Sequence, residues 1–309
     1  MITIFAPDGI GEVVPDRDLP SMIMAAVDAD PSGPLRPGDI VVITSKIISK
    51  AENRYADAAD RESVITAESR SVVAQRGALR ITRTLAGLTI AAAGVDNSNV
   101  EPGRILLLPA DPDSSASRLA AGLGAAVGGP IGVIISDTAG RPWRLGQTDH
   151  AIGAAGVTVL QPYAGHTDPY GNELAVTTMA VADELAAAAD LVKQKLAGRP
   201  VAVIRGLADL VGPQPLERQD ARAIVRTGRE DLFSHGSREA VLAALCRALG
   251  VPEAYDELVG LPPDEVATAL LERATVPADP AELVSDLLAA ASQLGVSEAQ
   301  DDQAQSDQA

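Results

Sequence analysis

Cysteine and histidine are scarce in this chain of 309 residues, which contains one cysteine, Cys246, and three histidines, His150, His166 and His235. A single cysteine excludes an intramolecular disulfide and any zinc site made of several cysteines. The histidines are too far apart in sequence to suggest a histidine-rich metal motif. A metal bound by this protein would therefore be held by oxygen ligands.

Aromatic residues are also few, at 2% of the sequence, although 46% of the residues are hydrophobic. The length is sufficient for two domains of modest size, and the hydrophobic fraction is sufficient for a sizeable core. That core must be made mainly of alanine, valine, leucine and isoleucine side chains. The same composition excludes wholesale disorder.

Basic residues are outnumbered, since 25 lysines and arginines face 42 aspartates and glutamates and give a net charge of −17. A surface this acidic repels phosphate backbones and anionic lipids, so we expect neither a nucleic acid nor a membrane as partner. The uncharged run Leu119–Ile135 contains Gly128, Gly129 and Pro130, which interrupt it and argue against a membrane span. The start of the chain lacks a basic targeting region and a cleavage site, which predicts a cytoplasmic protein.

Apolar runs of strand length mix with helical patterns over the first part of the chain, in an order too irregular for a βα barrel. We expect an α/β domain with a mixed, α+β sheet over residues 1–236, a small helical appendix over residues 237–296 and a disordered acidic tail over residues 297–309. The expected strands are Ile2–Phe5, Asp39–Thr44, Leu88–Val95, Arg104–Leu108, Ile131–Ser136, Val157–Leu160 and Pro200–Ile204. The expected helices are Leu19–Ala29, Ala67–Ala78, Ser114–Val127, Met179–Leu196, Arg238–Leu249, Asp264–Glu272 and Pro280–Leu294.

Polar residues cluster just beyond apolar strands at several places. Functional groups often collect at such positions, because the sheet is rigid and its strand ends reach solvent. The clusters are Gly9–Val13, Thr44–Lys50, Gly94–Asn99, Ser136–Asp149 and Asp168–Glu173.

Two aspartates in these clusters, Asp96 and Asp137, each terminate an apolar run, and Thr138 follows the second. Two carboxylates and a hydroxyl suit Mg²⁺ or Mn²⁺ that bridges substrate phosphates. The alternative is structural, because aspartate also caps strand ends and forms Asx turns, and for either residue alone this alternative is favoured.

Two lysines, Lys46 and Lys50, follow the apolar run Asp39–Thr44. If this stretch begins a helix, the lysines share one face at i, i+4 spacing and can meet the same phosphate. Spacing alone favours the simpler alternative of two surface lysines whose charged ends reach solvent.

Two arginines, Arg141 and Arg144, flank the only tryptophan, Trp143. Guanidinium groups near a carboxylate cluster can hold an anionic substrate through forked hydrogen bonds. A loop in which the tryptophan anchors two solvated arginines is equally compatible with the pattern.

Several well-known motifs are absent from the sequence. It has no G-x-x-x-x-G-K-[ST] phosphate loop, and Gly9-x-Gly11 lacks the third glycine of a dinucleotide fingerprint. It has no G-x-S-x-G, and Cys246 lies in an Ala/Leu-rich stretch typical of a core. The residues alone therefore indicate an α/β enzyme that handles phosphates with an oxygen-ligated divalent metal.

Taken together, these segments resemble the coenzyme F-420-0 γ-glutamyl ligases, GTP-dependent enzymes that add glutamate to a deazaflavin cofactor. The resemblance extends from about Ile2 to Phe233, and the pattern SDT-x-GR-x-WR-x-GQTD is highly specific. The segments that carry it are TSKIISK (44–50), AAAGVDNSNV (91–100), ISDTAGRPWRLGQTDHAIGAAG (135–156), DPYGNEL (168–174) and VADELAAAADLVKQKLAGRPVAVIRG (181–206).

The resemblance implies a role for each matching residue. It implies two divalent ions, Mg²⁺ or Mn²⁺, with K⁺ as a further candidate, and a nucleotide loop after Gly206 that is matched too poorly here for its residues to be assigned. It also implies a two-lobed fold and a homodimer. The implied metal ligands are Asp96, Asp137 and Thr138, and the implied GTP-binding residues are Ile10, Gly11, Glu12, Val13, Ser45, Lys46, Lys50 and Asn99.

The implied reaction joins L-glutamate to coenzyme F-420-0 through an acyl phosphate. We add Arg141 and Arg144 as catalytic candidates that hold an anionic substrate group.

Relatives fused to a flavin-binding reductase exist, but the roughly 75 residues after Phe233 are too few for that domain, so we expect no flavin activity. His150 replaces a small residue of the family and is given no catalytic role. Two rival functions stay open, namely a metal-dependent phosphohydrolase and a non-catalytic nucleotide-binding regulator.

Overall fold

The computed structural model describes residues 1–212, 220–227, 231, 233–261, 263–274 and 279–292. The chain divides into two compact units. Unit 1 comprises residues 1–61 and 94–225, and unit 2 comprises residues 62–93 and 226–309. The predicted tail, residues 297–309, lies outside the described residues, and the predicted domain boundaries stay a prediction.

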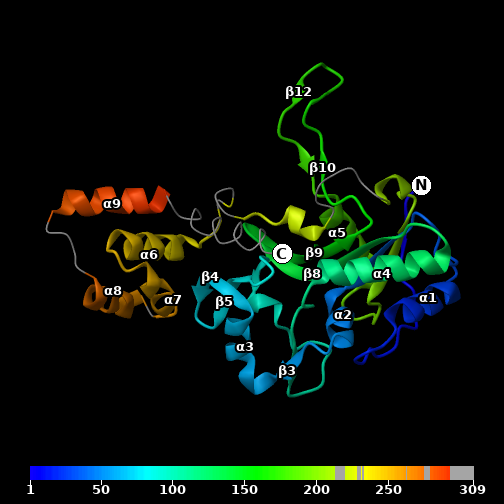
Figure 1. Cartoon of the computed structure of the whole chain (residues 1–309), viewed down its shortest axis with the longest axis horizontal. Coiled ribbons are helices and arrows are strands. Elements are labelled where there is room, and N and C mark those ends of the chain that lie inside the picture. Colours follow the sequence, from blue (N-terminus) through cyan, green and yellow to red (C-terminus); the bar gives the residue numbers. More distant parts are fainter. Residues whose placement is uncertain (213–219, 228–230, 232, 262, 275–278, 293–309) are drawn as a thin grey trace. The chain divides into compact units, whose positions relative to one another are not determined.

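Helices and strands mix throughout the described residues, which confirms the predicted α+β class (Figure 1). The strands are β1 (Thr3–Phe5), β2 (Ile40–Thr44), β3 (Tyr55–Asp57), β4 (Ser69–Arg76), β5 (Leu79–Thr84), β6 (Thr89–Ala91), β7 (Arg104–Leu106), β8 (Gly132–Arg141), β9 (Arg144–Ala155), β10 (Gln161–Pro162), β11 (His166–Thr167), β12 (Glu173–Leu174), β13 (Thr178–Met179) and β14 (Val201–Arg205). The helices are α1 (Leu19–Ala29), α2 (Ser45–Ala51), α3 (Arg61–Ala67), α4 (Pro112–Val127), α5 (Val181–Lys193), α6 (Ser237–Ala248), α7 (Tyr255–Leu258), α8 (Pro263–Arg273) and α9 (Pro280–Ser292).

The core of unit 1 is a five-stranded sheet in the order β1-β14-β2-β8-β9. Strands β2 and β8 are parallel, whereas the other neighbours are antiparallel. The parallel pair is almost entirely buried where its strands are aligned, and valine and isoleucine predominate there, as expected for central strands. Its last aligned residues are Thr44 and Ser136, so both strands reach the same edge of the sheet together.

Helices cover both faces of this sheet. Alternate residues such as Ile40, Val42 and Ile134 pack with the alanine-rich face of α5. The intervening residues point to the opposite face, where α1 and α4 lie. The predicted α1 agrees with the structure at both ends, because Asp18 caps its first turn and accepts a hydrogen bond from the Ser21 amide.

The β8–β9 hairpin is longer than the sequence indicates. Only the first part of β8 was expected, and β9 was not, because its first half is polar and glycine-rich. The register shifts by one residue between the pairs Ile135–Gly153 and Ser136–Ala151, so Ile152 forms a β-bulge. The bulge reverses which face the preceding β9 residues occupy.

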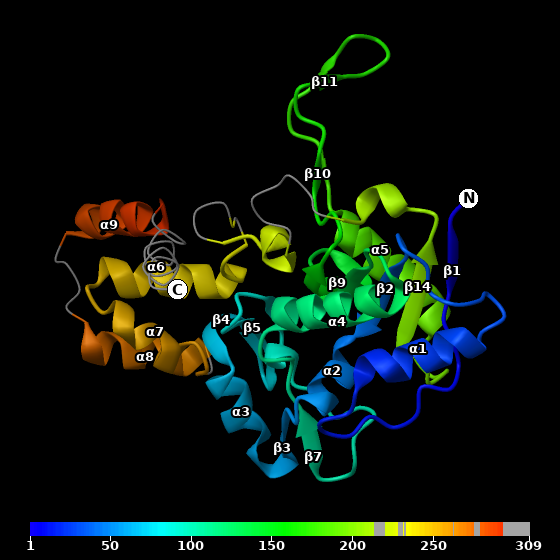
Figure 2. The ribbon, with the colours of Figure 1, turned by 45° about the vertical axis from the view of Figure 1, so that its right-hand side comes forward.

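A long hairpin projects from unit 1 between Gln161 and Met179, as both views show (Figures 1 and 2). Its two short ladders pair β10 with β13 and β11 with β12. The predicted strand Val157–Leu160 is wrong, since the structure gives only an isolated bridge between Val157 and Val211.

Unit 2 contains the sheet β4-β5-β6 and the C-terminal helices. The predicted helix Ala67–Ala78 is wrong, because most of this segment forms β4 in a hairpin with β5. The helical region itself is confirmed, and a cluster including Leu242, Cys246 and Leu258 forms its core. Glu239 of α6 is buried and accepts a hydrogen bond from the Gln75 amide of β4 at 3.0 Å, which attaches the helices to the sheet.

Gly153 allows α4 to approach β9 closely. A Cβ atom at this position would lie 2.5 Å from the backbone of Pro112, which cannot move without displacing the start of α4. Gly153→Ala is therefore expected to lower the free energy of unfolding by about 1–3 kcal/mol. Gly140→Ala is the control, because no atom of the residues that the structure describes lies within 4 Å of its added Cβ. Denaturant unfolding of both variants measures the difference, and equal stability would contradict the assigned contact.

Among the described residues, no helix combines the length and the apolar character needed to cross a membrane.

Candidate functional site

The predicted polar clusters meet where β2 and β8 end. Helix α2 begins at Ser45, immediately after β2, and Asp137 follows Ser136 on β8. The Ser45 hydroxyl donates a hydrogen bond to Oδ1 of Asp137 at 2.6 Å. Two residues that are 92 positions apart in sequence therefore share one site.

Asp96 joins this site through Lys46. The Lys46 ammonium forms an ion pair with Oδ2 of Asp96. Asp96 also accepts hydrogen bonds from the Ser98 amide at 2.8 Å and the Ser98 hydroxyl at 2.9 Å. The Asx turn proposed as the structural alternative is thus present, and it holds the carboxylate toward Lys46. Burial tends to raise the pKa of Asp96, but the hydrogen bonds and charge from Lys46 and Ser98 outweigh it, so the pKa is lowered.

The pKa of Asp137 is shifted in the opposite direction, upward. Burial raises its pKa to about 6, and the negative charges of Asp149 and Asp96 add to the effect. The hydrogen bond from Ser45 and the charge of Lys46 oppose the shift without cancelling it. Lys46 therefore acts on both carboxylates, which places one ammonium and two acidic groups together.

Lys50 lies one turn after Lys46 and contacts a different carboxylate. Its ammonium pairs with Oε1 of Glu12 at 2.5 Å. The Lys50 side chain is only 9% exposed, whereas that of Glu12 is 71% exposed. Lys50 is therefore a buried cation rather than a solvated surface lysine. The pair also brings the Gly9–Val13 turn to the end of α2.

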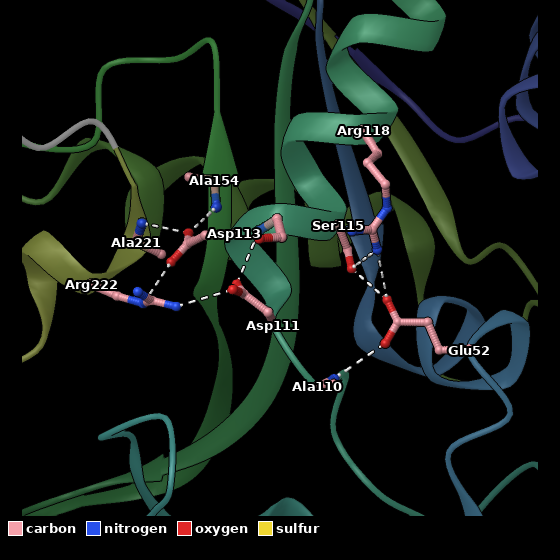
Figure 3. Close-up of polar contacts among 10 residues, drawn as sticks. Glu52, Ala110, Asp111, Asp113, Ser115, Arg118, Ala154, Ala221 and Arg222 are labelled. Carbon is pink, nitrogen blue, oxygen red and sulfur yellow. Dashed lines mark hydrogen bonds and ion pairs between the residues drawn. The ribbon is translucent and has the colours of Figure 1, made fainter. Parts of the chain in front are cut away.

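The C-terminal end of α2 is fixed to the start of α4 (Figure 3). Glu52, which follows α2, accepts hydrogen bonds from the Ala110 amide at 3.2 Å, the Ser115 hydroxyl and the Arg118 guanidinium at 3.3 Å. These contacts hold the helix that carries both lysines.

A second group of contacts in Figure 3 fixes the chain that follows β14. Oδ1 of Asp113 accepts hydrogen bonds from the Ala154 and Ala221 amides, both at 2.8 Å. Arg222 adds ion pairs to Asp111 and Asp113. Residues 220–224 are therefore attached to β9 and to the first turn of α4.

Other predicted residues are not brought into contact with these carboxylates by any hydrogen bond or ion pair that the described structure shows. Asn99 is exposed and has a left-handed backbone with φ of 59°. Arg141 is partly buried, and its Nε atom has no hydrogen-bond partner among the described residues. Arg144 is exposed beside Trp143 at the tip of the β8–β9 hairpin, and Trp143 is 83% exposed.

Thr138 points away from Asp137. Its hydroxyl donates to Oδ1 of Asp149 at 2.7 Å, and neighbouring residues of a strand point to opposite faces. Asp149 also forms a buried ion pair with Lys193 at 2.6 Å. Asp149 ends the GQTD pattern and Lys193 lies in the segment 181–206, but the sequence indicates no role for either residue, because their proximity depends on the bulge at Ile152.

The described residues alone do not complete a divalent-cation site. In the part of the chain that the structure describes, no group of three or more histidine, cysteine, aspartate or glutamate residues could hold a metal ion. The carboxylates of Asp96 and Asp137 are hard oxygen donors, which suit Mg²⁺ or Mn²⁺. Magnesium sites in enzymes that act on nucleotides often use one or two carboxylates completed by phosphate oxygens, so the donor set is compatible with such a site.

Comparison with known sequences identifies the family. Residues 9–206 match the family model described as F420-0:Gamma-glutamyl ligase. The chain is 38% identical over 246 residues to coenzyme F420:L-glutamate ligase of Methanopyrus kandleri, covering 72% of this chain and 93% of that protein. It is 37% identical over 226 residues to the Halobacterium salinarum protein of the same name (65% of this chain, 85% of the relative). It is 36% identical over 249 residues to that of Natronomonas pharaonis (72% and 93%). The matched segment contains the assembled carboxylates and lysines, and the chain belongs to the F420-0:Gamma-glutamyl ligase family.

Proposed function

We propose that this protein ligates L-glutamate to coenzyme F420-0, and then further γ-linked glutamates, with GTP as co-substrate. The observation that carries the proposal is the cluster of Asp96, Asp137 and Lys46 beside the ends of two parallel strands, with Lys50 one helical turn further along α2, all inside the family-matched segment. Such a cluster combines cation ligands with phosphate-binding ammonium groups. The names of the relatives support the choice of acceptor and amino acid.

The proposed reaction has two steps. The terminal carboxylate of coenzyme F420-0 attacks the γ-phosphorus of GTP, and the bond to the β-phosphate oxygen breaks to give an acyl phosphate and GDP. The neutral amine of glutamate then attacks the acyl carbon, inorganic phosphate leaves, and the amine gives up a proton as the amide forms. Both steps develop or move negative charge on phosphate oxygens, which positive groups stabilise.

The chain's own residues supply binding and orientation. Lys46 and Lys50 contact phosphate oxygens, while the Ile10–Val13 turn, Ser45 and Asn99 position the nucleotide. Arg141 and Arg144 hold an anionic group of the acceptor or of glutamate. When bound by Asp96 and Asp137, two Mg²⁺ or Mn²⁺ ions, with K⁺ as a further candidate, would supply positive charge to the triphosphate. Thr138, the third ligand that the resemblance implies, would join them only if its hydroxyl left Asp149. We also propose that the protein acts as a cytoplasmic homodimer.

Product analysis tests the function directly. The purified protein is incubated with GTP, Mn²⁺, L-glutamate and coenzyme F420-0, and the products are analysed by mass spectrometry. The proposal requires a product heavier by one glutamate residue together with GDP and phosphate. Phosphate release without amide would instead indicate a phosphohydrolase. Nucleotide binding without turnover would indicate a regulator, and replacing GTP by ATP tests the choice of nucleotide.

A further inference from the structure

A buried ion pair lies behind the end of β8, on the opposite face of the sheet from the Asp137 carboxylate. The side chains of Asp149 and Lys193 are 3% and 5% exposed, and their charged atoms are 2.6 Å apart. Lys193 lies in the last turn of α5, where a cation is favoured by the helix dipole. Burial tends to raise the pKa of Asp149, but Lys193 and two hydroxyl donors outweigh it, so the pKa is lowered and the carboxylate is ionised.

Within the described residues, the side-chain hydrogen bonds of this pair to β8 are made with Ser136 and Thr138, the residues on either side of Asp137. The Ser136 hydroxyl donates to Oδ2 of Asp149 at 2.8 Å and accepts from the Lys193 ammonium at 2.9 Å. The Thr138 hydroxyl donates to Oδ1 of Asp149 at 2.7 Å. Asp149 thus accepts hydrogen bonds through both oxygens, and the buried network satisfies its charges.

The end of β8 has little other support at this point. Its pairing with β2 stops at Ser136, so β9 is the only strand in the described part of the chain that pairs with residues 137 and 138. Fixing Ser136 and Thr138 on one face fixes the direction of Asp137 on the other, because side chains alternate along a strand. The bulge at Ile152 places the Asp149 side chain on the same face of the sheet as that of Thr138, its partner in the ladder.

We propose that Asp149 and Lys193 are positioning residues. By hydrogen bonding to Ser136 and Thr138 on one face of β8, they orient the Asp137 carboxylate on the other face toward Ser45 and Lys46. Stability alone explains such a pair poorly, since replacing a buried ion pair with apolar residues is often neutral or stabilising. Removing a carboxylate that orients a metal ligand without binding the metal itself typically lowers metal affinity by about ten- to a hundredfold. The proposal rests on the proposed function, in which Asp137 is a metal ligand.

The test replaces both charges together. Asp149→Leu/Lys193→Met leaves no unpaired buried charge, so we expect it to fold. Its affinity for Mn²⁺, measured by electron paramagnetic resonance in the presence of GDP, should fall by about tenfold. In its crystal structure, the 2.6 Å contact between Ser45 and Asp137 should be lost. Unchanged Mn²⁺ affinity with this contact intact would overturn the proposal.

A second ion pair of the same unit provides the matched control. Arg205 and the buried Asp39 are 2.8 Å apart at the other end of β2, away from the site. Asp39→Leu/Arg205→Met should retain the Mn²⁺ affinity of the unaltered protein. Equal losses in both double variants would mean that any broken ion pair has this effect, and would likewise overturn the positioning role.

A milder variant covers the case in which the double variant does not fold. Ser136→Ala keeps the ion pair and removes one of the two hydroxyls through which it acts. Mn²⁺ affinity should fall by a few-fold, and an unchanged affinity with Asp137 still on Ser45 would overturn the proposal.

The outcomes separate this inference from the proposed function. An unaltered protein that binds Mn²⁺ but forms no amide refutes the activity alone, and the affinity comparison still decides the positioning role. If the unaltered protein binds no Mn²⁺, the metal assignment fails. The crystal structures of the variants then decide whether the pair directs Asp137.

Discussion

A protein in which Asp137 is replaced by asparagine is expected to lose amide formation and yet to be more stable than the unaltered protein at pH 7. The loss follows because a neutral amide is a much weaker ligand for a divalent cation than a carboxylate. The gain follows because burial raises the pKa of Asp137 to about 6 from 3.8, so folding at pH 7 requires a buried charge. We expect the free energy of unfolding to rise by about 1–3 kcal/mol.

The pH dependence of this gain has a defined sign. Between about pH 4 and pH 6, the unfolded chain releases the Asp137 proton before the folded protein does, so this residue reduces stability as the pH rises. Asp137→Asn lacks the effect. The difference in melting temperature between the two proteins should therefore be largest above about pH 6 and disappear near pH 4. A difference that is independent of pH would contradict the assigned burial.

Asp111→Ala is the control and should give the opposite result in both measurements. Asp111 caps α4 by accepting a hydrogen bond from the Ser114 amide at 3.0 Å, and its removal should lower stability by about 1 kcal/mol. Amide formation should persist, because the residue lies outside the carboxylate cluster. If Asp137→Asn instead retains near wild-type turnover at limiting Mn²⁺, Asp137 is not a metal ligand.

Local signals explain which elements the sequence could predict. The predicted bounds of helix α1 agree with the structure because its sequence is rich in alanine and Pro31, Gly33 and Pro34 follow its end. The proximity of Ser45 and Asp137 was accessible because polar residues after parallel strands meet at one edge of the sheet. The helix predicted over Ala67–Ala78 is wrong because the residues of this segment are compatible with either a helix or a strand. Pairing with β5 stabilises the strand.

Ion pairs between residues that are distant in sequence could not be predicted from sequence patterns. Asp149 faces Lys193 only because the bulge at Ile152 changes the orientation of β9, and one residue more or less in the hairpin would turn the carboxylate away. The contact between Lys50 and Glu12 likewise joins a turn and a helix that are 38 residues apart. Neither pair has a characteristic spacing.

Lys50→Met should weaken GTP binding by about 10- to 100-fold, the range expected for a lost hydrogen bond to a charged group. Methionine keeps much of the apolar stem of this side chain, which is only 9% exposed, and removes the ammonium. The lost contact exists in the ground state and in the transition state, so the affinity for GTP changes while the requirement for glutamate does not. Calorimetric titration with GTP measures the effect.

Glu12→Gln is the matched variant and should act in the opposite direction. Glu12 is the present partner of Lys50, at 2.5 Å, so a phosphate must compete with its carboxylate for the ammonium. Glutamine occupies the same space without the charge. GTP affinity should rise by at most about fivefold, because the Glu12 carboxylate is largely exposed and a solvent-screened ion pair contributes up to ~1 kcal/mol. In the double variant Lys50→Met/Glu12→Gln this gain should vanish, since no ammonium remains to be released. A gain that persists in the double variant would show that Glu12 repels the nucleotide directly, and equal GTP affinity in Lys50→Met and the unaltered protein would remove Lys50 from the site.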